Sequence, residues 1–242
     1  MSRLQGQVVV VTGGGSGVGK AIAAQLLQNG AKVVIAGRDA AKLEAAAAEL
    51  GGEIFAVATD VSDAKQCAEL IASATKHFGR VDVLINNAGA NLKARTVREL
   101  TPESWDQMIG ANLDGAFYCI HAVLPQMLER KSGLIINIVS VAGKRANPLG
   151  GAAYVAAKHG MGALGTVLAN EEKDSGIRLS NIYPGEIDTP ILVNRPRPVT
   201  AEQLAVILKP EDVASAVLFV AGLPAHVSIP ELVIKPTVHQ YW

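Results

Sequence analysis

The amino-acid sequence predicts an α/β fold in which seven parallel strands form one sheet and helices cover both of its faces. Short runs rich in Val, Ile and Leu alternate with longer stretches that carry Ala and Leu at helical spacing. Hydrophobic residues make up 49% of the 242 residues and charged residues only 18%, as expected when parallel strands are buried on both faces. The pattern contains no repeat or linker, so residues 1–242 are expected to form a single domain.

The expected elements follow one another in a regular order. Strands are predicted at Gln7–Val11, Lys32–Ala36, Glu53–Ala58, Val81–Asn86, Leu134–Val139, Arg178–Tyr183 and Glu231–Lys235. Helices are predicted at Val18–Asn29, Ala40–Leu50, Asp63–Phe78, Pro102–Arg130, Ala152–Asp174 and Pro210–Ala221. Asp39 and Thr101 suit N-caps, with Pro102 at a first helical position. Helix C-terminal stops are expected at Gly30, Gly51, Gly79 and Gly176. Such strand-helix-strand repeats give a doubly wound, Rossmann-type sheet that binds ligands beyond the carboxyl ends of its strands.

Charge and cysteine content exclude several classes of partner. Lys+Arg and Asp+Glu both number 22, so no net charge draws the protein to nucleic acid or to a membrane, and neither is expected as a partner. Cys67 and Cys119 are expected to be reduced, buried thiols. The five histidines are scattered and no metal site is readable. The first residues resemble neither a signal peptide nor a membrane span, so a cytoplasmic enzyme is expected.

The first predicted strand leads directly into a glycine-rich loop at Thr12–Gly19. Glycines let the backbone approach a pyrophosphate closely, and the free amides at the start of the next helix favour anionic oxygens. The expected cofactor contacts in this loop are Gly13, Gly15, Ser16, Gly17, Val18 and Gly19. The strict GxGxxG and GxxxxGK[ST] spacings are absent, and a flexible glycine turn is the alternative.

Arg38 follows the second predicted strand, where nicotinamide enzymes select their cofactor. An acidic side chain there commonly binds the ribose 2′-hydroxyl, whereas an arginine accommodates a 2′-phosphate. Asp39 comes next, but its place at the start of a helix favours a capping role. The sequence therefore favours NADP, with NAD as the second possibility, and a solvated surface charge is the alternative for Arg38.

Tyr154 and Lys158 lie one helical turn apart, and Ser140 precedes them in the sequence. The shared helix face lets the ammonium lower the pKa of the phenol. Lowering a tyrosine pKa from about 10 to about 7.5 requires about 3.4 kcal/mol. An ammonium about 4 Å away supplies about 4 kcal/mol at an effective dielectric of about 20, but only about 1 kcal/mol in water. Together with the glycine loop, the pair predicts a hydride-transfer enzyme with a partly dry pocket.

The motifs, taken together, resemble those of the short-chain dehydrogenase/reductase family. They are TGxxxGxG at Thr12–Gly19, NNAG at Asn86–Gly89, a mid-helix Asn112, Ser140, YxxxK at Tyr154 and Lys158, and PG…T at Pro184–Thr189. These motifs occur in the same order along the chain as in the family, between Gln7 and Pro190. The pattern departs from NADP-linked members in one respect, because Ser16 stands where many of them carry a basic residue.

The resemblance implies a role for each of four residues. Tyr154 would be the acid in carbonyl reduction and the base in alcohol oxidation, and Ser140 would donate a hydrogen bond to the substrate oxygen. Asn112 would hold a water that relays protons to Lys158, and the lysine would also bind the nicotinamide ribose. A turn serine and a solvated asparagine are the alternatives for Ser140 and Asn112.

Further cofactor contacts are also implied by the resemblance alone. Asp60 and Val61 would meet the adenine, although Asp60 is alternatively the first residue of a turn. The remaining contacts are Asn87, Ala88 and Gly89 near the adenosine, and Pro184, Gly185, Ile187 and Thr189 near the nicotinamide.

The predicted function is hydride transfer between a nicotinamide cofactor and a small carbonyl or secondary-alcohol substrate, with an NADPH-linked reductase favoured. The alternatives are an NAD-linked alcohol dehydrogenase, a non-catalytic NADP-binding sensor, and a lyase or isomerase that recycles its cofactor. In the family, the helix at Ala152–Asp174 and the helix before it pair across subunits, so a homodimer or homotetramer is expected.

Substrate recognition is expected in segments that follow strand ends without a helical pattern. These segments are Asn91–Arg98, Lys144–Gly151 and Ile191–Lys209, the last within a substrate loop of about 186–209. Arg195 and Arg197 either recognise an anionic substrate or stay solvated. The tail at Leu223–Trp242 is expected to complete a subunit interface or a wall of the substrate pocket. Ketone, sugar, steroid and acyl thioester substrates all remain open.

Overall fold

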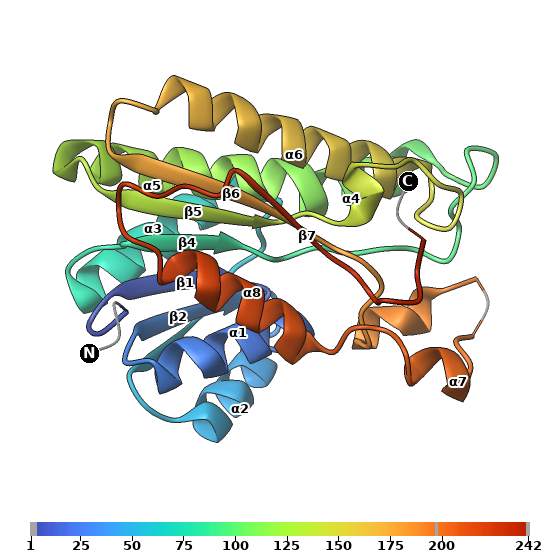
Figure 1. Cartoon of the computed structure of the whole chain (residues 1–242), viewed down its shortest axis with the longest axis horizontal. Coiled ribbons are helices and arrows are strands. Elements are labelled where there is room, and N and C mark those ends of the chain that lie inside the picture. The colour runs from blue at the N-terminus through green and yellow to red at the C-terminus, as the bar shows by residue number, and fades with distance from the viewer. Residues whose placement is uncertain (1–3, 197, 241–242) are drawn as a thin grey trace.

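The computed structural model describes residues 4–196 and 198–240, which build one sheet of seven parallel strands between two layers of helices (Figure 1). The strands are β1 (Val8–Thr12), β2 (Lys32–Gly37), β3 (Ile54–Ala58), β4 (Val83–Asn86), β5 (Gly133–Ile138), β6 (Ile177–Pro184) and β7 (Glu231–Ile234). Their order is β3-β2-β1-β4-β5-β6-β7, so the direction of winding reverses between β1 and β4. Doubly wound sheets bind ligands at this switch point. The predicted fold class is confirmed.

Each face of the sheet has its own hydrophobic core, because side chains alternate along a strand. On one face, Val9 and Val11 of β1 pack with residues of α1 (Gly17–Gln28), α2 (Ala40–Leu50) and α8 (Pro210–Ala221). On the other face, Val10 packs with residues of α3 (Ala64–Phe78), α5 (Gly115–Arg130) and α6 (Ala152–Glu171). Figure 1 shows these two layers on opposite sides of the strands. The continuous apolar runs of the sequence are therefore explained by burial on both faces.

Two helix predictions are wrong in detail. The stretch Pro102–Arg130 is interrupted: α4 (Pro102–Ile109) runs into a π-helical turn, η1 (Gly110–Asp114), before α5 begins. In this turn the Gly115 N–H donates to the Gly110 carbonyl, five residues back, which makes the turn wider than an α-helical one. The other helix, α6, ends at Glu171, and Gly176 lies just before β6 with a φ of +81° instead of ending the helix.

The segments expected to lack helix contain three short helical turns. These are η2 (Val141–Gly143), η3 (Pro190–Asn194) and α7 (Ala201–Leu204). Thr200 caps α7 by accepting a hydrogen bond from the Gln203 N–H, a local signal that sequence analysis missed. The predicted caps at Asp39 and Thr101 are confirmed, since their side chains accept hydrogen bonds from Lys42 and Ser104 amides. Arg197 and the last two residues of the tail lie outside the described residues.

A row of three buried asparagines crosses the middle of the sheet. Asn86, Asn137 and Asn181 are paired in register on β4, β5 and β6. The Asn86 amide donates to Asn137, the Asn137 amide donates to Asn181, and the Asn181 amide donates to the Gly162 carbonyl of α6, each at 3.0 Å. Polar groups in a core are stabilising only when they are hydrogen-bonded, and this row ties α6 to the strand ends beside it.

Candidate active site

The carboxyl ends of β1, β4, β5 and β6 meet along one edge of the sheet, where most of the predicted site residues gather. Thr12 and Asn86 are the last residues of β1 and β4, and Pro184 is the last residue of β6. Ser140 lies two residues beyond β5. Tyr154 and Lys158 lie in the first two turns of α6, which packs beside these ends. The switch point therefore brings together groups from distant parts of the sequence.

The glycine loop after β1 is folded tightly against the end of β4. Gly13 has a φ of +67°, and a Cβ there would lie 2.9 Å from the Asn87 Nδ2 atom. A Cβ on Gly19 would lie 2.6 Å from the same atom and would overlap the Gly13 carbonyl. Ser16, at the N-cap of α1, makes no side-chain hydrogen bond to the first helical turn. The backbone amides of this turn and the space left by the glycines therefore fit a pyrophosphate.

Thr12 holds this loop to β4, and sequence analysis missed its role. Its Oγ1 accepts hydrogen bonds from the Asn87 and Ala88 N–H groups, each at 3.0 Å, and donates to the Ile85 carbonyl at 3.3 Å. The Asn87 side chain donates in return to the Thr12 carbonyl at 2.9 Å. The available signal was the position of Thr12, which is a hydroxyl residue directly between a buried strand and the glycines. The two strand ends are thus fixed relative to each other.

Lys158 is almost completely buried beside Tyr154. Its Nζ lies 5.8 Å from the centre of the Tyr154 ring, and only 3% of the residue is exposed. The ammonium donates hydrogen bonds to the Ile138 carbonyl at 2.9 Å and to the Met161 Sδ at 3.5 Å. Ser140 is hydrogen-bonded to Tyr154, and its Oγ also accepts from the Ala142 N–H of η2. The structure therefore brings the predicted Ser, Tyr and Lys together.

Burial dominates the proton affinities of these groups. It raises the pKa of Tyr154, and the hydrogen bond with Ser140 and the positive charge of Arg95 lower that pKa only in part. Burial also lowers the pKa of Lys158 to about 7. The sequence argument expected Lys158 to bring the phenol pKa down. In the protein without cofactor, desolvation shifts the pKa values of Tyr154 and Lys158 more than any neighbouring group does, because both side chains are buried.

Asn112 lies in the π-helical turn η1 and is 1% exposed. Both of its amide hydrogens are used, since Nδ2 donates to the Ala90 carbonyl at 3.0 Å and to the Met108 carbonyl at 2.9 Å. Its Oδ1 accepts from the Ala90 N–H at 3.2 Å. The expected alternative of a solvated side chain is wrong. The side chain holds the segment after β4 in place.

Two adjoining cavities open at this edge. The smaller, of about 260 Å³, is the cofactor cavity; it lies between the glycine loop, Asn87–Gly89 and α6 and includes Asn112, Lys158 and Pro184. The larger, of about 450 Å³, is the substrate cavity; it lies among the segments that the sequence assigned to substrate recognition. Both are lined by Ser140, Tyr154, Gly185, Ile187, Thr189 and Ile191. Tyr154 and Ser140 therefore stand where the two cavities meet.

Five predicted cofactor residues lie outside both cavities. They are Gly15, Gly19, Arg38, Asp60 and Val61. Arg38 is exposed just beyond β2. Asp60 accepts hydrogen bonds from the Ser62 N–H at 3.0 Å and the Ser62 hydroxyl at 2.7 Å, which is the turn that the sequence gave as the alternative. Val61 is buried against Gly115 at the start of α5.

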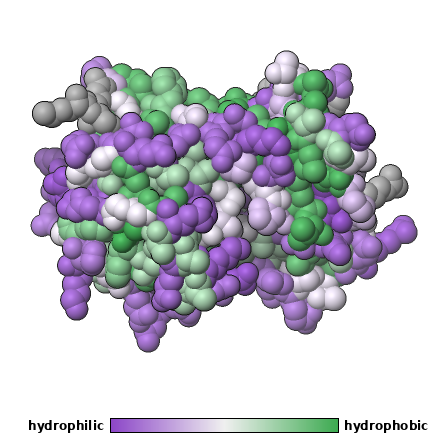
Figure 2. All heavy atoms as spheres, turned by 90° about the horizontal axis from the view of Figure 1, so that it is seen from below, coloured by the Kyte–Doolittle hydropathy of each residue, from purple (hydrophilic) through white to green (hydrophobic). Residues whose placement is uncertain are grey.

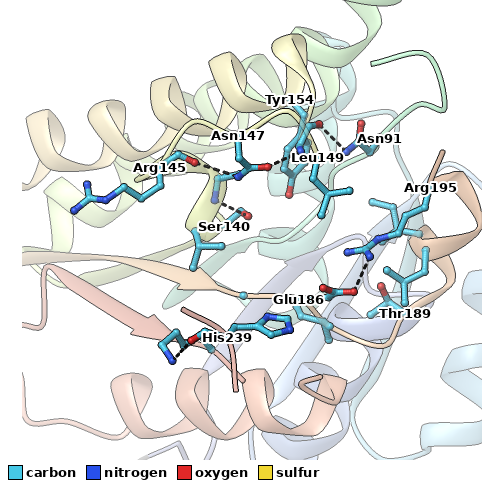
Figure 3. A pocket seen from close by; sticks show the side chains of 18 of the residues that line it. Asn91, Ser140, Arg145, Asn147, Leu149, Tyr154, Glu186, Thr189, Arg195 and His239 are labelled. Carbon is cyan, nitrogen blue, oxygen red and sulfur yellow. Dashed lines mark hydrogen bonds and ion pairs between the residues drawn. The ribbon is translucent and has the colours of Figure 1, made fainter. Parts of the chain in front are cut away.

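The substrate cavity also contains charged groups. Sequence analysis did not single out Arg95 or Glu186. It did name Arg195, whose alternative as a solvated charge is wrong, because its side chain is only 16% exposed and lines the cavity. Figure 3 shows Ser140, Asn147, Leu149 and Tyr154 on one side and Glu186, Thr189, Arg195 and His239 on the other. Arg195 and Glu186 form an ion pair at 2.7 Å. Arg95 lines the cavity and is only 8% exposed. It belongs to the predicted segment Asn91–Arg98, but nothing in the local sequence distinguished it from Arg98, which is exposed.

Comparison with known proteins identifies the family. The sequence profile of the short chain dehydrogenase family matches residues 7–199. The chain belongs to this family. An uncharacterised oxidoreductase of Staphylococcus aureus strain MW2 is 37% identical over 237 residues, which cover 98% of this chain and 100% of the relative. The chain is therefore an oxidoreductase of the short chain dehydrogenase family.

Solved structures of family members are similar over nearly the whole chain. A closed form of a serine dehydrogenase complexed with NADP⁺ has a TM-score of 0.90, 33% identity and 97% coverage of each chain. A 3-ketoacyl-(acyl-carrier-protein) reductase from Brucella melitensis, complexed with NADH, has a TM-score of 0.88, 31% identity and coverage of 96% of this chain and 98% of that chain. These neighbours support binding of NAD or NADP at the cradle described above.

Cys67 and Cys119 are free and buried, as predicted. Within residues 4–196 and 198–240, no three or more His, Cys, Asp or Glu side chains are grouped so as to hold a metal ion. No helix in the same ranges is long and apolar enough to span a membrane.

Proposed function

We propose that this short chain dehydrogenase transfers a hydride between NADP(H) and a small carbonyl or secondary-alcohol substrate, with Tyr154 as general acid in reduction and general base in oxidation. The observation that carries the proposal is the position of Tyr154 at the wall that both cavities share, with Ser140 beside it. A substrate oxygen that reaches both hydroxyls from the substrate cavity presents its carbon toward the cofactor cavity. NADPH, when bound, supplies the hydride.

Each neighbouring group has a distinct part in the proton transfer. Ser140 donates a hydrogen bond that stabilises the negative charge developing on the substrate oxygen. When protonated, the Lys158 ammonium, whose Nζ lies 5.8 Å from the centre of the Tyr154 ring, favours ionisation of the phenol. Because burial opposes that ionisation, the positive charge of an oxidised nicotinamide would assist Lys158 during alcohol oxidation. Asn112 holds the segment at Ala90 and would hold a water that relays protons to Lys158.

Replacement of Tyr154 tests this assignment. Tyr154→Phe removes the proton donor while keeping the ring, and we expect kcat to fall about 10²- to 10⁴-fold with the dissociation constant of NADPH nearly unchanged. Tyr118→Phe, on α5 and outside both cavities, is the matched control and should retain full activity. A Tyr154→Phe enzyme that binds NADPH normally and keeps more than about a tenth of the turnover would refute the assignment.

We propose NADP as the preferred cofactor because Arg38 stands beyond β2 and no acidic group replaces it. Asp39, the nearest carboxylate in the sequence, is engaged as the N-cap of α2. Arg38 makes no hydrogen bond or ion pair with the described part of the chain, so its guanidinium is free to meet a 2′-phosphate. NADPH should bind more tightly than NADH at fixed ionic strength. Arg38→Ala should reduce the ratio of the two affinities about 10-fold. Equal or tighter binding of NADH by the wild type would contradict the proposal.

Other functions remain distinguishable by a single assay. A panel of carbonyls and alcohols, followed through the absorbance of the reduced nicotinamide, separates them. Net cofactor turnover indicates the oxidoreductase, product without net turnover indicates a lyase or isomerase, and neither indicates a sensor. The serine dehydrogenase among the structural neighbours makes hydroxy acids a natural group to include, because serine carries a hydroxyl and a carboxylate.

We further propose that the protein forms a homodimer or homotetramer through α5 and α6. Apolar side chains are exposed on these helices, notably Phe117 at 47% and Val167 at 54%. Such residues on adjacent surface helices favour burial against a second copy. Light scattering at micromolar concentration should give at least twice the mass of the 25.2 kDa chain, and a monomer would contradict this proposal.

A further inference from the structure

We propose that Arg95 and Arg195 form an anion subsite in the substrate cavity, and that the substrate is therefore a small oxo or hydroxy acid. This inference rests on the proposed function, because it places the carboxylate of the substrate while Tyr154 and Ser140 meet its carbonyl or hydroxyl. It extends that function by naming the substrate class.

The first support is an imbalance of charge within the cavity. The chain as a whole has equal numbers of basic and acidic residues. The cavity lining, by contrast, includes Arg95, Arg145, Arg195 and Lys235, and Glu186 is its only carboxylate among residues 4–196 and 198–240. Lys235 donates to two backbone carbonyls near the tail, and Figure 3 shows the Arg145 guanidinium directed away from the other labelled side chains. Arg195 is paired with Glu186, so the uncompensated charge that faces a substrate is that of Arg95, with Arg195 lining the same cavity.

The second support is the state of Arg95, which is a buried cation without a carboxylate partner among the described residues. Its guanidinium donates to the carbonyls of Leu92 at 2.7 Å, Asn194 at 2.9 Å and Leu149. Glu99, the nearest acid in the sequence, bonds the Arg95 backbone N–H instead of the guanidinium. A guanidinium has five N–H donors, so these three bonds leave donors available. Buried charges are normally paired, and a ligand carboxylate would supply the missing partner.

The third support is the location of the two arginines relative to the catalytic tyrosine. The positive charge of Arg95 lowers the pKa of Tyr154, and burial followed by the charge of Arg195 lowers the pKa of Arg95. All three side chains line the same cavity, and the Arg95 guanidinium donates to the carbonyl of Asn194, the residue before Arg195, at 2.9 Å. Glu186 already balances Arg195. An anion bound beside Arg95 would therefore restore neutrality a short distance from the reacting oxygen.

The remaining lining limits the rest of the ligand. Leu149, Ile187, Ile191 and Leu192 present apolar side chains to the same cavity. A volume of about 450 Å³ suits a small molecule. The lining therefore fits a ligand with a carboxylate at Arg95, a reacting oxygen at Tyr154 and a short apolar body between them.

Binding of short oxo acids and their neutral analogues tests the subsite. The probes are pyruvate, acetoacetate and levulinate, which space the carbonyl and the carboxylate differently, with the corresponding amides as uncharged controls. Calorimetry with the NADP⁺-loaded enzyme should show at least one acid binding about 10- to 100-fold more tightly than its amide, which is typical of a charge-assisted hydrogen bond. That preference should weaken as ionic strength rises. Equal binding of each acid and its amide, or no binding of any acid, would overturn the proposal.

Variants separate charge recognition from a purely structural role of Arg95. Arg95→Gln keeps a hydrogen-bond donor for the loops and should reduce the preference for the acid to about 1, with little change in amide binding. Arg95→Lys should keep most of the preference, and Arg98→Gln, on the same segment but exposed, should keep all of it. If Arg95→Gln weakens acid and amide binding equally, Arg95 only holds the loops together and the proposed anion subsite is refuted.

The outcomes also distinguish this inference from the proposed function. Turnover of amides and acids at equal kcat/KM would refute the subsite while leaving the oxidoreductase proposal intact. Tight and selective binding of an acid without any change in nicotinamide absorbance across the whole carbonyl and alcohol panel would support the subsite and refute the redox role.

Discussion

The cofactor half and the substrate half of the site are built in different ways. The cofactor half consists of strand ends and backbone: the glycine loop, Thr12 and Asn87 contact one another directly through hydrogen bonds of about 3 Å. The substrate half consists of side chains from segments that follow β4, β5 and β6, together with residues of the tail. Its polar contacts join parts of the chain that are far apart, as when Arg95 bonds the carbonyls of Leu149 and Asn194.

This difference determines how many substitutions each half can accept without a change in its fold. Close backbone contacts at Gly13 and Gly19 leave no room for a side chain, so a substitution at either position changes the fold of the loop. Apolar side chains are exposed around the substrate half, including Ile191, Val193 and Val206. Figure 2 shows an apolar band at the end of the molecule that carries α7. Substitutions in this half should change which substrate is bound more than whether the protein folds.

The largest expected effect is in the glycine loop. Gly19→Ala would place a methyl group 2.6 Å from the Asn87 side chain and over the Gly13 carbonyl, so the loop cannot keep its shape. We expect NADPH affinity to fall at least about 100-fold, measured by fluorescence titration, because the pyrophosphate cradle is lost. Gly15→Ala is the matched control, since its nearest new contact is 3.3 Å from a flexible Leu43 methyl group. Similar losses in both variants would mean that the cradle depends on flexibility and not on close contact.

A second test concerns the charge buried where the halves meet. Burial lowers the pKa of Lys158 in the folded protein to about 7, below its unfolded value of about 10.4. Between these values the unfolded chain binds more protons, so the stability that Lys158 costs below pH 7 is regained as pH rises toward 10. Lys158→Met should therefore be more stable than the wild type near pH 6. Its advantage should shrink by up to about 1.4 kcal/mol per pH unit between pH 7 and 10.

Urea unfolding of both proteins across this pH range measures the difference. Other titrating groups are shared by the two proteins and largely cancel. A stability difference that does not depend on pH would show that Lys158 does not change its protonation on unfolding in this range, and the assigned burial of its charge would be wrong.

A smaller effect is expected from the hydroxyl that joins β1 to β4. Thr12→Val keeps the shape of the side chain but leaves the buried N–H groups of Asn87 and Ala88 without their acceptor. We expect a loss of about 1–3 kcal/mol in the free energy of unfolding, accompanied by weaker NADPH binding. Thr12→Ser retains the hydroxyl and should lose less than half as much. If Val and Ser were equally destabilising, the methyl group and not the hydroxyl would be important.

Part of the cofactor half could be predicted from the sequence because its chemistry is local. Glycines after a strand, and a tyrosine and lysine one turn apart, are readable as patterns, and the structure brings these groups together. The sheet was predictable for the same reason, since burial on both faces leaves continuous apolar runs. The π-helical turn at Asn112 was not predictable, because its side chain satisfies groups at Ala90 that lie outside the helix.

The substrate half was not predictable because its partners are distant in sequence. The segment Asn91–Arg98 holds two arginines with no local difference between them, yet only Arg95 is buried. Its burial depends on carbonyls at Leu149 and Asn194, about 50 and 100 residues later, which no periodicity reveals. The direction of the Tyr154 pKa was missed for a related reason, since desolvation depends on the whole surrounding structure.

The smallest expected effect tests whether the two halves are separable. Leu149 lines the substrate cavity and is 53% exposed, so Leu149→Ala should change the free energy of unfolding by no more than about 0.5 kcal/mol. The Arg95 bond to the Leu149 carbonyl involves only the backbone and should persist. We expect kcat/KM for a substrate with an apolar body to fall about 3- to 10-fold, because a hydrophobic contact is lost. NADPH affinity, measured in parallel, should stay within about twofold; a parallel loss would show that the substrate loops also hold the cofactor, and that the division between the halves is incorrect.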